Sequence, residues 1–401
     1  MRVAIVQEHI DAGRGGAETS TLELARELAR LGPEVTLVCA GRHPAPPGIG
    51  VGGVRSQVIG VHGPTKLRRT RHFAERAAGF YRAQAFDIVH AITPCAGCHV
   101  YQPRGGTYAE TVRRSVALAR GPLWRLVRSV GRRLNLRQRF LLRLERELLA
   151  SPRPPFVAAV SDYVRRQVER DFPEFPCERL RVVFNGVSID PGSADERARW
   201  RIGLRTAFGL DERTPLVLFV AHNFRLKGLA ELIRAIAAGA AAVSPPPVLL
   251  VVGRDRTAPY ARLAKRCGVG ERVQFFGPVD DIRRLYAAAD VLAHPTWYDP
   301  CSRVVLEALC CGLPVVTTRF NGAAEVIEPD RHGVVIESPA DIPSLVDAIG
   351  RCLRADVRTA CAADAERMRQ RLSMARHARA LLDLYEEAQR GVPACGSPMS
   401  P

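Results

Sequence analysis

Short apolar runs alternate with longer amphipathic segments along almost the whole chain. The runs have the length and composition of buried strands. The segments between them repeat apolar residues every three or four positions, as helices that cover a sheet do. In the first half of the chain the predicted strands are residues 2–6, 35–39, 86–91, 98–101, 156–160 and 181–184. This alternation predicts a parallel sheet with helices on its faces.

A second set of strands follows a polar stretch at residues 186–195, which is the predicted linker. The strands predicted after it are residues 216–221, 248–252, 273–276, 291–294, 315–317 and 334–336. With 401 residues, the chain is also longer than a usual single domain. We therefore predict an α/β fold with two doubly wound, Rossmann-like domains at residues 1–185 and 186–372. Ligands bind such sheets at the carboxyl ends of the strands.

The segment 293–317 carries the most informative pattern. After a predicted strand, a loop holds the carboxylate Asp299, a helix begins near Ser302, and that helix holds Glu307 before ending at Gly312. A helix N-terminus attracts phosphate, because its first N–H groups are unpaired and its dipole is positive there. A carboxylate inside the helix can accept two hydroxyl hydrogen bonds from a ribose, and the loop carboxylate can approach a sugar. The segment therefore predicts a nucleotide-sugar site.

This segment resembles the acidic signature of the retaining glycosyltransferases of family 4, which have glutamates at the positions of Asp299 and Glu307. Asp299 is one methylene shorter than the family's glutamate, and Ser302 stands where the family commonly has glycine. Other motifs follow in the family's order: Val251-Val252-Gly253-Arg254-Asp255, Phe275-Phe276-Gly277, Leu285-Tyr286-Ala287-Ala288-Ala289-Asp290, His294-Pro295, Leu306-Glu307-Ala308 and Gly312-Leu313-Pro314-Val315.

The resemblance implies the GT-B fold, in which two Rossmann-like domains face each other across a cleft and the last helix, here 373–390, crosses back onto the first domain. It implies that residues 1–185 bind the acceptor and residues 186–372 bind the nucleotide sugar. Within the family, the chain is most similar to the bacterial lipopolysaccharide core glucosyltransferases, so a UDP-glucose donor and a lipid-linked saccharide acceptor are expected. The resemblance also implies front-face substitution with retention, in which the leaving phosphate accepts the acceptor's proton. No metal cluster is apparent in the sequence, and Lys227 and Arg225 can replace the charge of a cation, so no metal and no cofactor are expected. The Pro/Ser/Gly-rich tail 391–401 is predicted to be disordered.

Most of the further predicted site residues lie in loops that follow strands, whereas Arg179 lies just before the predicted strand 181–184. Gly15 and Gly16 let the backbone approach a ligand closely, although an ordinary tight turn is the alternative. Arg225 and Lys227 stand where the family places two cations on the diphosphate, on which charge develops as the glycosidic bond breaks. We assign these two cations and Asp299 catalytic roles. Besides Gly15, Gly16 and Glu307, the predicted donor ligands are Arg179, Arg254, Val279, Cys301, Ser302, Arg303, Gly322 and Glu325.

Charge adds a second prediction. The chain carries a formal net charge of +17, and residues 104–147 contain 12 Arg and 3 Glu. Apolar residues recur there at helical spacing with arginines between them, which is typical of a helix that lies on an anionic membrane surface. The predicted membrane contacts are Trp124, Arg125, Arg128 and Arg132. A helix packed on the first domain with a solvated arginine face is the alternative.

The remaining alternatives concern partners and location. Nucleic acid is not expected, because no zinc knuckle or helix-turn-helix motif is visible and aromatic residues are only 6% of the chain. A transferase with another donor, such as GDP-mannose, or a non-catalytic basic protein of the same fold would also fit. The 11 cysteines, many within apolar segments, indicate a reducing compartment. With no apolar run of about 20 residues, we expect a cytoplasmic protein at the inner face of the cell membrane.

Overall fold

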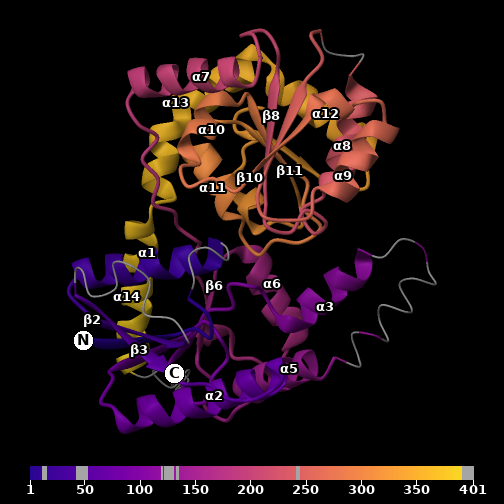
Figure 1. Cartoon of the computed structure of the whole chain (residues 1–401). Helices are drawn as coiled ribbons and strands as arrows, with labels where there is room; N and C mark the ends of the chain where they lie inside the picture. The colour runs from indigo at the N-terminus through magenta and orange to yellow at the C-terminus, as the bar shows by residue number, and fades with distance from the viewer. Residues whose placement is uncertain are drawn as a thin grey trace, which may run out of the picture. The chain divides into compact units, whose positions relative to one another are not determined.

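The computed structural model describes residues 1–10, 16–41, 53–118, 121, 131, 135–240 and 244–390. The chain divides into two compact units. Unit 1 contains Met1–Gly186 and the chain from Met374 onward, and unit 2 contains Val187–Ser373. Each unit is built around its own parallel sheet (Figure 1). The tail at 391–401 lies outside the described residues.

The sheet of unit 1 has seven parallel strands in the order β3-β2-β1-β4-β5-β6-β7. They are β1 (Arg2–Val6), β2 (Glu34–Ala40), β3 (Val54–Ile59), β4 (Ile88–Ala91), β5 (Val100–Tyr101), β6 (Phe156–Ala159) and β7 (Leu180–Val182). Strand β3 was not predicted, because it lies at the sheet edge. Solvent-facing Arg55 and Gln57 interrupt its apolar pattern there.

The helices of unit 1 are α1 (Gly16–Arg30), α2 (Lys66–Ala83), α3 (Tyr108–Ala117), α5 (Leu136–Leu149), α6 (Asp162–Asp171), the 3-10 turn η1 (Cys177–Arg179) and α14 (Met374–Arg390). Helices α1 and α14 pack side by side over one face of the sheet (Figure 1). Leu24 and Leu28 of α1 and Leu381 and Tyr385 of α14 bury their side chains there with Ile5 of β1. The predicted return of the last helix onto the first domain is therefore confirmed.

The sheet of unit 2 has six parallel strands in the order β10-β9-β8-β11-β12-β13. They are β8 (Leu216–Val220), β9 (Val248–Val252), β10 (Val273–Gly277), β11 (Val291–His294), β12 (Val315–Thr318) and β13 (Gly333–Ile336). All six correspond to predicted strands. Most of their residues are apolar and buried, which is typical of parallel strands covered by helices, and this made them easy to recognise.

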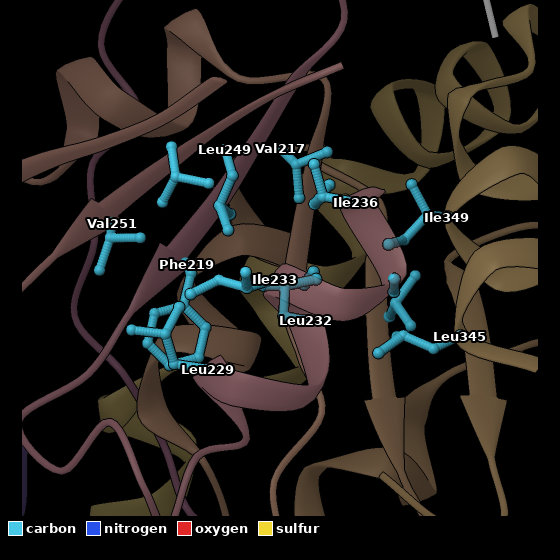
Figure 2. Close-up of a cluster of buried hydrophobic side chains, with 14 of the residues drawn as sticks. Val217, Phe219, Leu229, Leu232, Ile233, Ile236, Leu249, Val251, Leu345 and Ile349 are labelled. Carbon is cyan, nitrogen blue, oxygen red and sulfur yellow. The ribbon is translucent and has the colours of Figure 1, made fainter. Parts of the chain in front are cut away.

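The helices of unit 2 are α7 (Ala194–Ala207), α8 (Leu229–Gly239), α9 (Ala258–Arg266), α10 (Arg283–Ala288), α11 (Arg303–Cys310), α12 (Ile342–Leu353), α13 (Ala355–Arg371) and the 3-10 turns η2 (Gly270–Arg272) and η3 (Gly322–Val326). Figure 2 shows the core on one face of the sheet. Alternate residues of β8, Val217 and Phe219, point into it and meet Leu232 and Ile236 of α8. Ile349 of α12 closes the cluster. Alternate residues of the strand and one face of helix α8 thus pack together in one core, as their two-residue and helical periods predict.

Because every strand in a sheet runs in the same direction, the carboxyl ends of that sheet share one edge. In unit 2 this edge carries the loop after β8, the loop between β11 and α11, and the turn between β12 and η3. In unit 1 it carries the segments that follow β1, β4, β5 and β6. Within the described ranges, no helix is long and apolar enough to cross a membrane.

Candidate functional site

The loop after β8 and the loop after β11 lie against each other at the carboxyl edge of unit 2. The Trp297 N–H donates to the Leu226 carbonyl at 2.9 Å. Gly228 begins α8 with a positive φ of 80°, and a Cβ atom there would lie 2.1 Å from the Pro295 carbonyl oxygen. Only glycine permits both this conformation and this close approach. The result is that Lys227, just before the glycine, reaches the loop that holds Asp299.

Lys227 and Asp299 form a direct ion pair. The Lys227 Nζ donates to Asp299 Oδ2 at 2.5 Å and to the Tyr298 carbonyl at 3.1 Å. Burial alone would raise the pKa of Asp299, but the Lys227 ammonium and the neighbouring His294 outweigh it and hold that pKa well below its usual range. Two of the three predicted catalytic residues therefore meet, and the Asp299 carboxylate is an anion.

His294 completes this cluster, and its contact with Asp299 was not predicted. It is the last residue of β11, and its Nε2 lies 3.6 Å from Asp299 Oδ2. Burial lowers the pKa of His294 more than the nearby Asp299 carboxylate raises it, so the ring is neutral at pH 7. Neither ring nitrogen has a hydrogen-bond partner within the part of the chain that the structure describes. From the sequence, His294 could be recognised only as part of the His294-Pro295 motif, and nothing there indicated a contact with Asp299.

Asn321 connects the turn after β12 to the start of α11 through hydrogen bonds, and this role was not predicted from the sequence either. Its Oδ1 accepts from the N–H groups of Ser302 and Ala323, both at 3.0 Å, and its Nδ2 donates to Thr317 Oγ1 at 3.0 Å. The Gly322 N–H donates to the Asp299 carbonyl at 2.9 Å. The predicted role of Gly322 as a donor ligand is therefore corrected to a structural role. Its N–H is used by the Asp299 carbonyl and so does not bind a phosphate in this arrangement.

Glu307 lies one turn inside α11 with both carboxylate oxygens engaged. The Arg303 Nε donates to Oε1 at 2.5 Å, and the Tyr286 hydroxyl donates to Oε2 at 3.0 Å. Burial and the Glu307 carboxylate raise the pKa of Tyr286 well above its usual value, so this hydroxyl remains a donor. A carboxylate has about four acceptor positions. Glu307 can therefore be held in place and still accept hydroxyl hydrogen bonds from a ligand.

The other predicted residues of unit 2 lie along the same edge. Cys301 and Ser302 are buried at the start of α11. Arg225 follows β8, Arg254 follows β9 and Glu325 lies in η3, and all three are exposed, whereas Val279 after β10 is half-buried. The edge thus combines a buried, charge-paired centre with exposed cations around it.

Arg179 is not part of this arrangement. It lies in unit 1, in η1 immediately before β7, and therefore at the amino edge of the sheet. Its Nη1 donates to the Pro154 carbonyl at 2.8 Å, and its guanidinium carbon lies 5.0 Å from the centre of the Phe156 ring. Ligands bind at the opposite, carboxyl edge of such sheets. The prediction that Arg179 reaches the donor is therefore corrected to a structural role.

In unit 1, Gly16 is the first residue of α1. The predicted residues Gly15, Trp124, Arg125, Arg128 and Arg132 lie outside the described residues. No group of three or more histidine, cysteine, aspartate or glutamate side chains that could hold a metal ion occurs among the residues that are described.

A second polar cluster lies at the carboxyl end of β1. The Thr70 hydroxyl of α2 donates to Glu8 Oε1 at 2.8 Å, and Arg137 Nη2 of α5 donates to Glu8 Oε2 at 3.1 Å. The Arg137 Nε also donates to the Thr70 hydroxyl oxygen at 2.9 Å. These residues are far apart in sequence and belong to three elements, so no spacing in the sequence could have predicted that they meet.

Comparison with known proteins finds a matching protein family for each of the two units. The family model described as "Glycosyl transferases group 1" matches residues 203–371, and the one described as "Glycosyltransferase Family 4" matches residues 14–191. The chain is 30% identical over 417 residues to a D-inositol 3-phosphate glycosyltransferase of Xylanimonas cellulosilytica, covering 95% of this chain and 93% of that protein. It is 28% identical over 282 residues to the lipopolysaccharide glucosyltransferase WaaG of Escherichia coli K12, covering 70% of this chain and 69% of that protein.

Solved structures agree on the fold. The crystal structure of WaaG, a glycosyltransferase involved in lipopolysaccharide biosynthesis, superposes with a TM-score of 0.78 at 24% identity, covering 96% of this chain and all of that one. Anabaena Alr3699/HepE, solved in complex with UDP-glucose, superposes with a TM-score of 0.72 at 18% identity, covering 96% of this chain and 99% of that one. The chain belongs to the glycosyltransferases of this family and has their GT-B type of fold.

Proposed function

We propose that this glycosyltransferase moves a hexose, glucose, from UDP-glucose to a saccharide of the lipopolysaccharide core or to another lipid-linked saccharide. The observation that carries the proposal is the contact between Lys227 and Asp299 at the carboxyl edge of unit 2, beside the start of α11. It joins a cation suited to a diphosphate with an anion suited to sugar hydroxyls or to positive charge at the reacting carbon. The printed name of WaaG and the UDP-glucose complex of HepE support the sugar and the donor.

Each side chain has a separate task in this proposal. Lys227, with Arg225, stabilises the negative charge that develops on the departing diphosphate. Glu307, held by Arg303 and Tyr286, binds the ribose hydroxyls. Asp299 contacts the sugar. Since two cations supply the positive charge, we propose a transfer that needs no metal and retains the anomeric configuration, with the leaving phosphate taking the acceptor's proton.

The basic segment 104–147 would bring the enzyme to its acceptor. Arg139, Arg143 and Arg146 of α5 are exposed, and each cation near an anionic leaflet contributes roughly 1 kcal/mol to binding. We propose peripheral attachment at the cytoplasmic face of the cell membrane, where a lipid-linked acceptor would be presented. Liposome co-sedimentation tests this, because an Arg125/Arg128/Arg132→Glu variant should lose binding to anionic vesicles. Unchanged binding would exclude the segment as the membrane contact.

A second acceptor class is favoured by one observation. The D-inositol 3-phosphate glycosyltransferase matches 95% of this chain, a larger share than the 70% matched by WaaG. A phosphorylated polyol such as inositol 3-phosphate is therefore the alternative acceptor.

A donor and acceptor panel decides between these possibilities. The purified enzyme is incubated with UDP-glucose, UDP-galactose or GDP-mannose and either lipopolysaccharide inner-core oligosaccharide or inositol 3-phosphate, and products are identified by mass spectrometry. We expect transfer from UDP-glucose to the oligosaccharide, undiminished by a chelator, with an α-linkage in the NMR spectrum. Transfer only from GDP-mannose, or only to inositol 3-phosphate, would contradict the proposed donor or acceptor. Absence of both binding and turnover of every nucleotide sugar would contradict the enzymatic proposal itself.

A further inference from the structure

His294 is a buried polar group to which the proposed transfer gives no task. The residue is 1% exposed, and its ring stacks on Phe219 of β8, with the ring centres 6.2 Å apart. Its carbonyl accepts from the Thr317 hydroxyl at 2.9 Å and from the Thr296 N–H at 2.8 Å. The backbone and the ring are therefore held in place, while both ring nitrogens remain buried without a hydrogen bond in the described ranges.

Two charged groups face this ring. The loop after β8 contributes the Lys227 ammonium and the loop after β11 contributes the Asp299 carboxylate, whereas β8 and β12 contribute only Phe219 and Thr317. Asp299 Oδ2 is the shared point, 2.5 Å from Lys227 Nζ and 3.6 Å from His294 Nε2. A normal hydrogen bond to the imidazole requires about 2.9 Å. The ring is therefore less than one ångström from replacing the ammonium as the partner of this oxygen.

Lys227 has two tasks that conflict. In the free protein it neutralises Asp299, which is largely buried. In the proposed function it must also bind the diphosphate of the donor. A buried carboxylate that loses its only cation is strongly destabilised, and such a group either takes up a proton or acquires another partner. A protonated Asp299 could no longer stabilise positive charge at the reacting carbon.

We propose that His294 is the second counter-ion of Asp299. When a nucleoside diphosphate draws Lys227 away, His294 takes one proton from solvent and donates Nε2–H to Asp299 Oδ2, and it releases that proton when the nucleotide leaves. This inference rests on the proposed donor site. His294 is thus a positioning residue, which keeps Asp299 anionic and fixed with its other oxygen directed to the sugar. Donor binding is coupled to uptake of one proton.

The exchange of partners can be tested without any donor. In a Lys227→Met variant the ammonium is absent, so His294 is the one charged or titratable side chain of the described residues that remains beside the Asp299 carboxylate. In histidine-labelled NMR spectra, the pKa of His294 should lie below the ordinary value of about 6.5 in the wild-type protein and above it in Lys227→Met. A His294→Gln variant assigns the signal, and Lys265→Met, which removes an exposed lysine of α9, is the matched control.

A double variant shows whether the effect passes through Asp299. In Lys227→Met/Asp299→Asn the carboxylate is gone, so His294 should again remain neutral. The proposal is overturned if His294 stays neutral in the folded Lys227→Met single variant, or if it titrates equally high in the double variant.

Calorimetry on the wild-type chain is the second test, and it measures proton uptake when the nucleotide binds. UDP binding is measured in two buffers of different ionisation enthalpy between about pH 6 and 8, the range in which histidine titrates. The wild type should take up close to one proton more than His294→Gln at the lower pH, since the protonation of the nucleotide itself is common to both. Equal uptake overturns the proposal. If UDP does not bind the wild type at all, the proposed function fails, and the NMR titration still decides whether His294 replaces Lys227.

Discussion

The two units have the same order of their first six strands, with β8 in the position of β1, yet their carboxyl edges differ in chemistry. In unit 2 the carboxylate Asp299 is paired with a lysine from a neighbouring loop. In unit 1 the carboxylate Glu8 is paired with Thr70 and Arg137, which belong to the helices α2 and α5. The first pair can separate when a loop side chain turns to a ligand. The second joins the segment after β1 to two helices, so it has an evident structural task.

The comparison shows that the shared strand order determines where side chains lie at the carboxyl edge. The sequences of the loops and helices there determine which charged groups pair and what they can bind. A cation on a loop can serve a ligand, whereas a cation within a packed helix first serves the fold. Unit 1 also has buried hydrogen-bonding groups at this edge, since neither Gln7 Oε1 nor Gln102 Nε2 has a partner among the described residues. Four predictions test how far this distinction extends.

The largest effect is expected at Asp299. Replacing it with Asn removes the charge and preserves the shape, so kcat should fall by about a thousandfold, the size of effect seen when one preorganised electrostatic group is removed. The unfolding temperature should fall as well, because the ion pair with Lys227 is lost, although Lys227 keeps the Tyr298 carbonyl as a partner. Glu8→Gln is the matched variant in unit 1 and should lower stability more than kcat. If Glu8→Gln reduces kcat as much as Asp299→Asn, the distinction between the two edges is wrong.

Next in size is Gly228→Ala, which should destabilise unit 2. The new Cβ would lie 2.1 Å from the Pro295 carbonyl oxygen at a φ of 80°, and we expect a loss of about 3 to 4 kcal/mol in the free energy of unfolding. Gly203→Ala is the control, because a Cβ added to this helical glycine of α7 would have nothing within 4 Å. It should be neutral or slightly stabilising. Equal denaturation midpoints for the two variants would show that the close approach is not required.

The two units should also respond oppositely to pH. Burial raises the pKa of Glu145 in α5 from 4.5 to about 7, although Tyr108 and Tyr101 donate hydrogen bonds to it. Its protonated form is therefore favoured in the folded state, and unit 1 should lose roughly 3 kcal/mol of stability as pH rises from 4.5 to 7. Asp299 has a lowered pKa, so unit 2 keeps its contribution at neutral pH and loses it in acid.

Denaturant titrations at several pH values check this prediction. Glu145→Gln should flatten the pH dependence of unit 1 between 4.5 and 7 and leave unit 2 unchanged. An unaltered pH dependence in that variant would assign the effect to another group.

The smallest effect is expected for Glu307→Gln. The amide cannot accept the Arg303 and Tyr286 hydrogen bonds and two ribose hydroxyls equally well, so UDP affinity should fall about tenfold, or roughly 1.4 kcal/mol. Calorimetric titration with UDP measures this change, and the acceptor KM should be unaffected. Full affinity and full activity in this variant would exclude Glu307 as the ribose ligand.

Most of the fold could be predicted from the chain itself. The strands of unit 2 are mostly apolar, so all six were found, whereas β3 was missed because Arg55 and Gln57 interrupt its apolar pattern. The carboxylates Asp299 and Glu307 could be recognised because strand, loop and helix follow one another without interruption. The prediction for Arg179 was wrong although its place just before a strand of a predicted parallel sheet already puts it at the amino edge, away from the edge where ligands bind.

The sequence alone determined the two sheets, the loops at their carboxyl edges and the residue types those loops present, because these depend on local periodicity and on glycine and proline. Only the tertiary structure decided which of these residues are partners. Lys227 lies on a different segment from His294 and Asp299, and Asn321 reaches α11 from the turn after β12. Strand order decides which loops lie next to each other, and burial decides the free energy of each charged group. Neither can be derived from the spacing of residues along the chain.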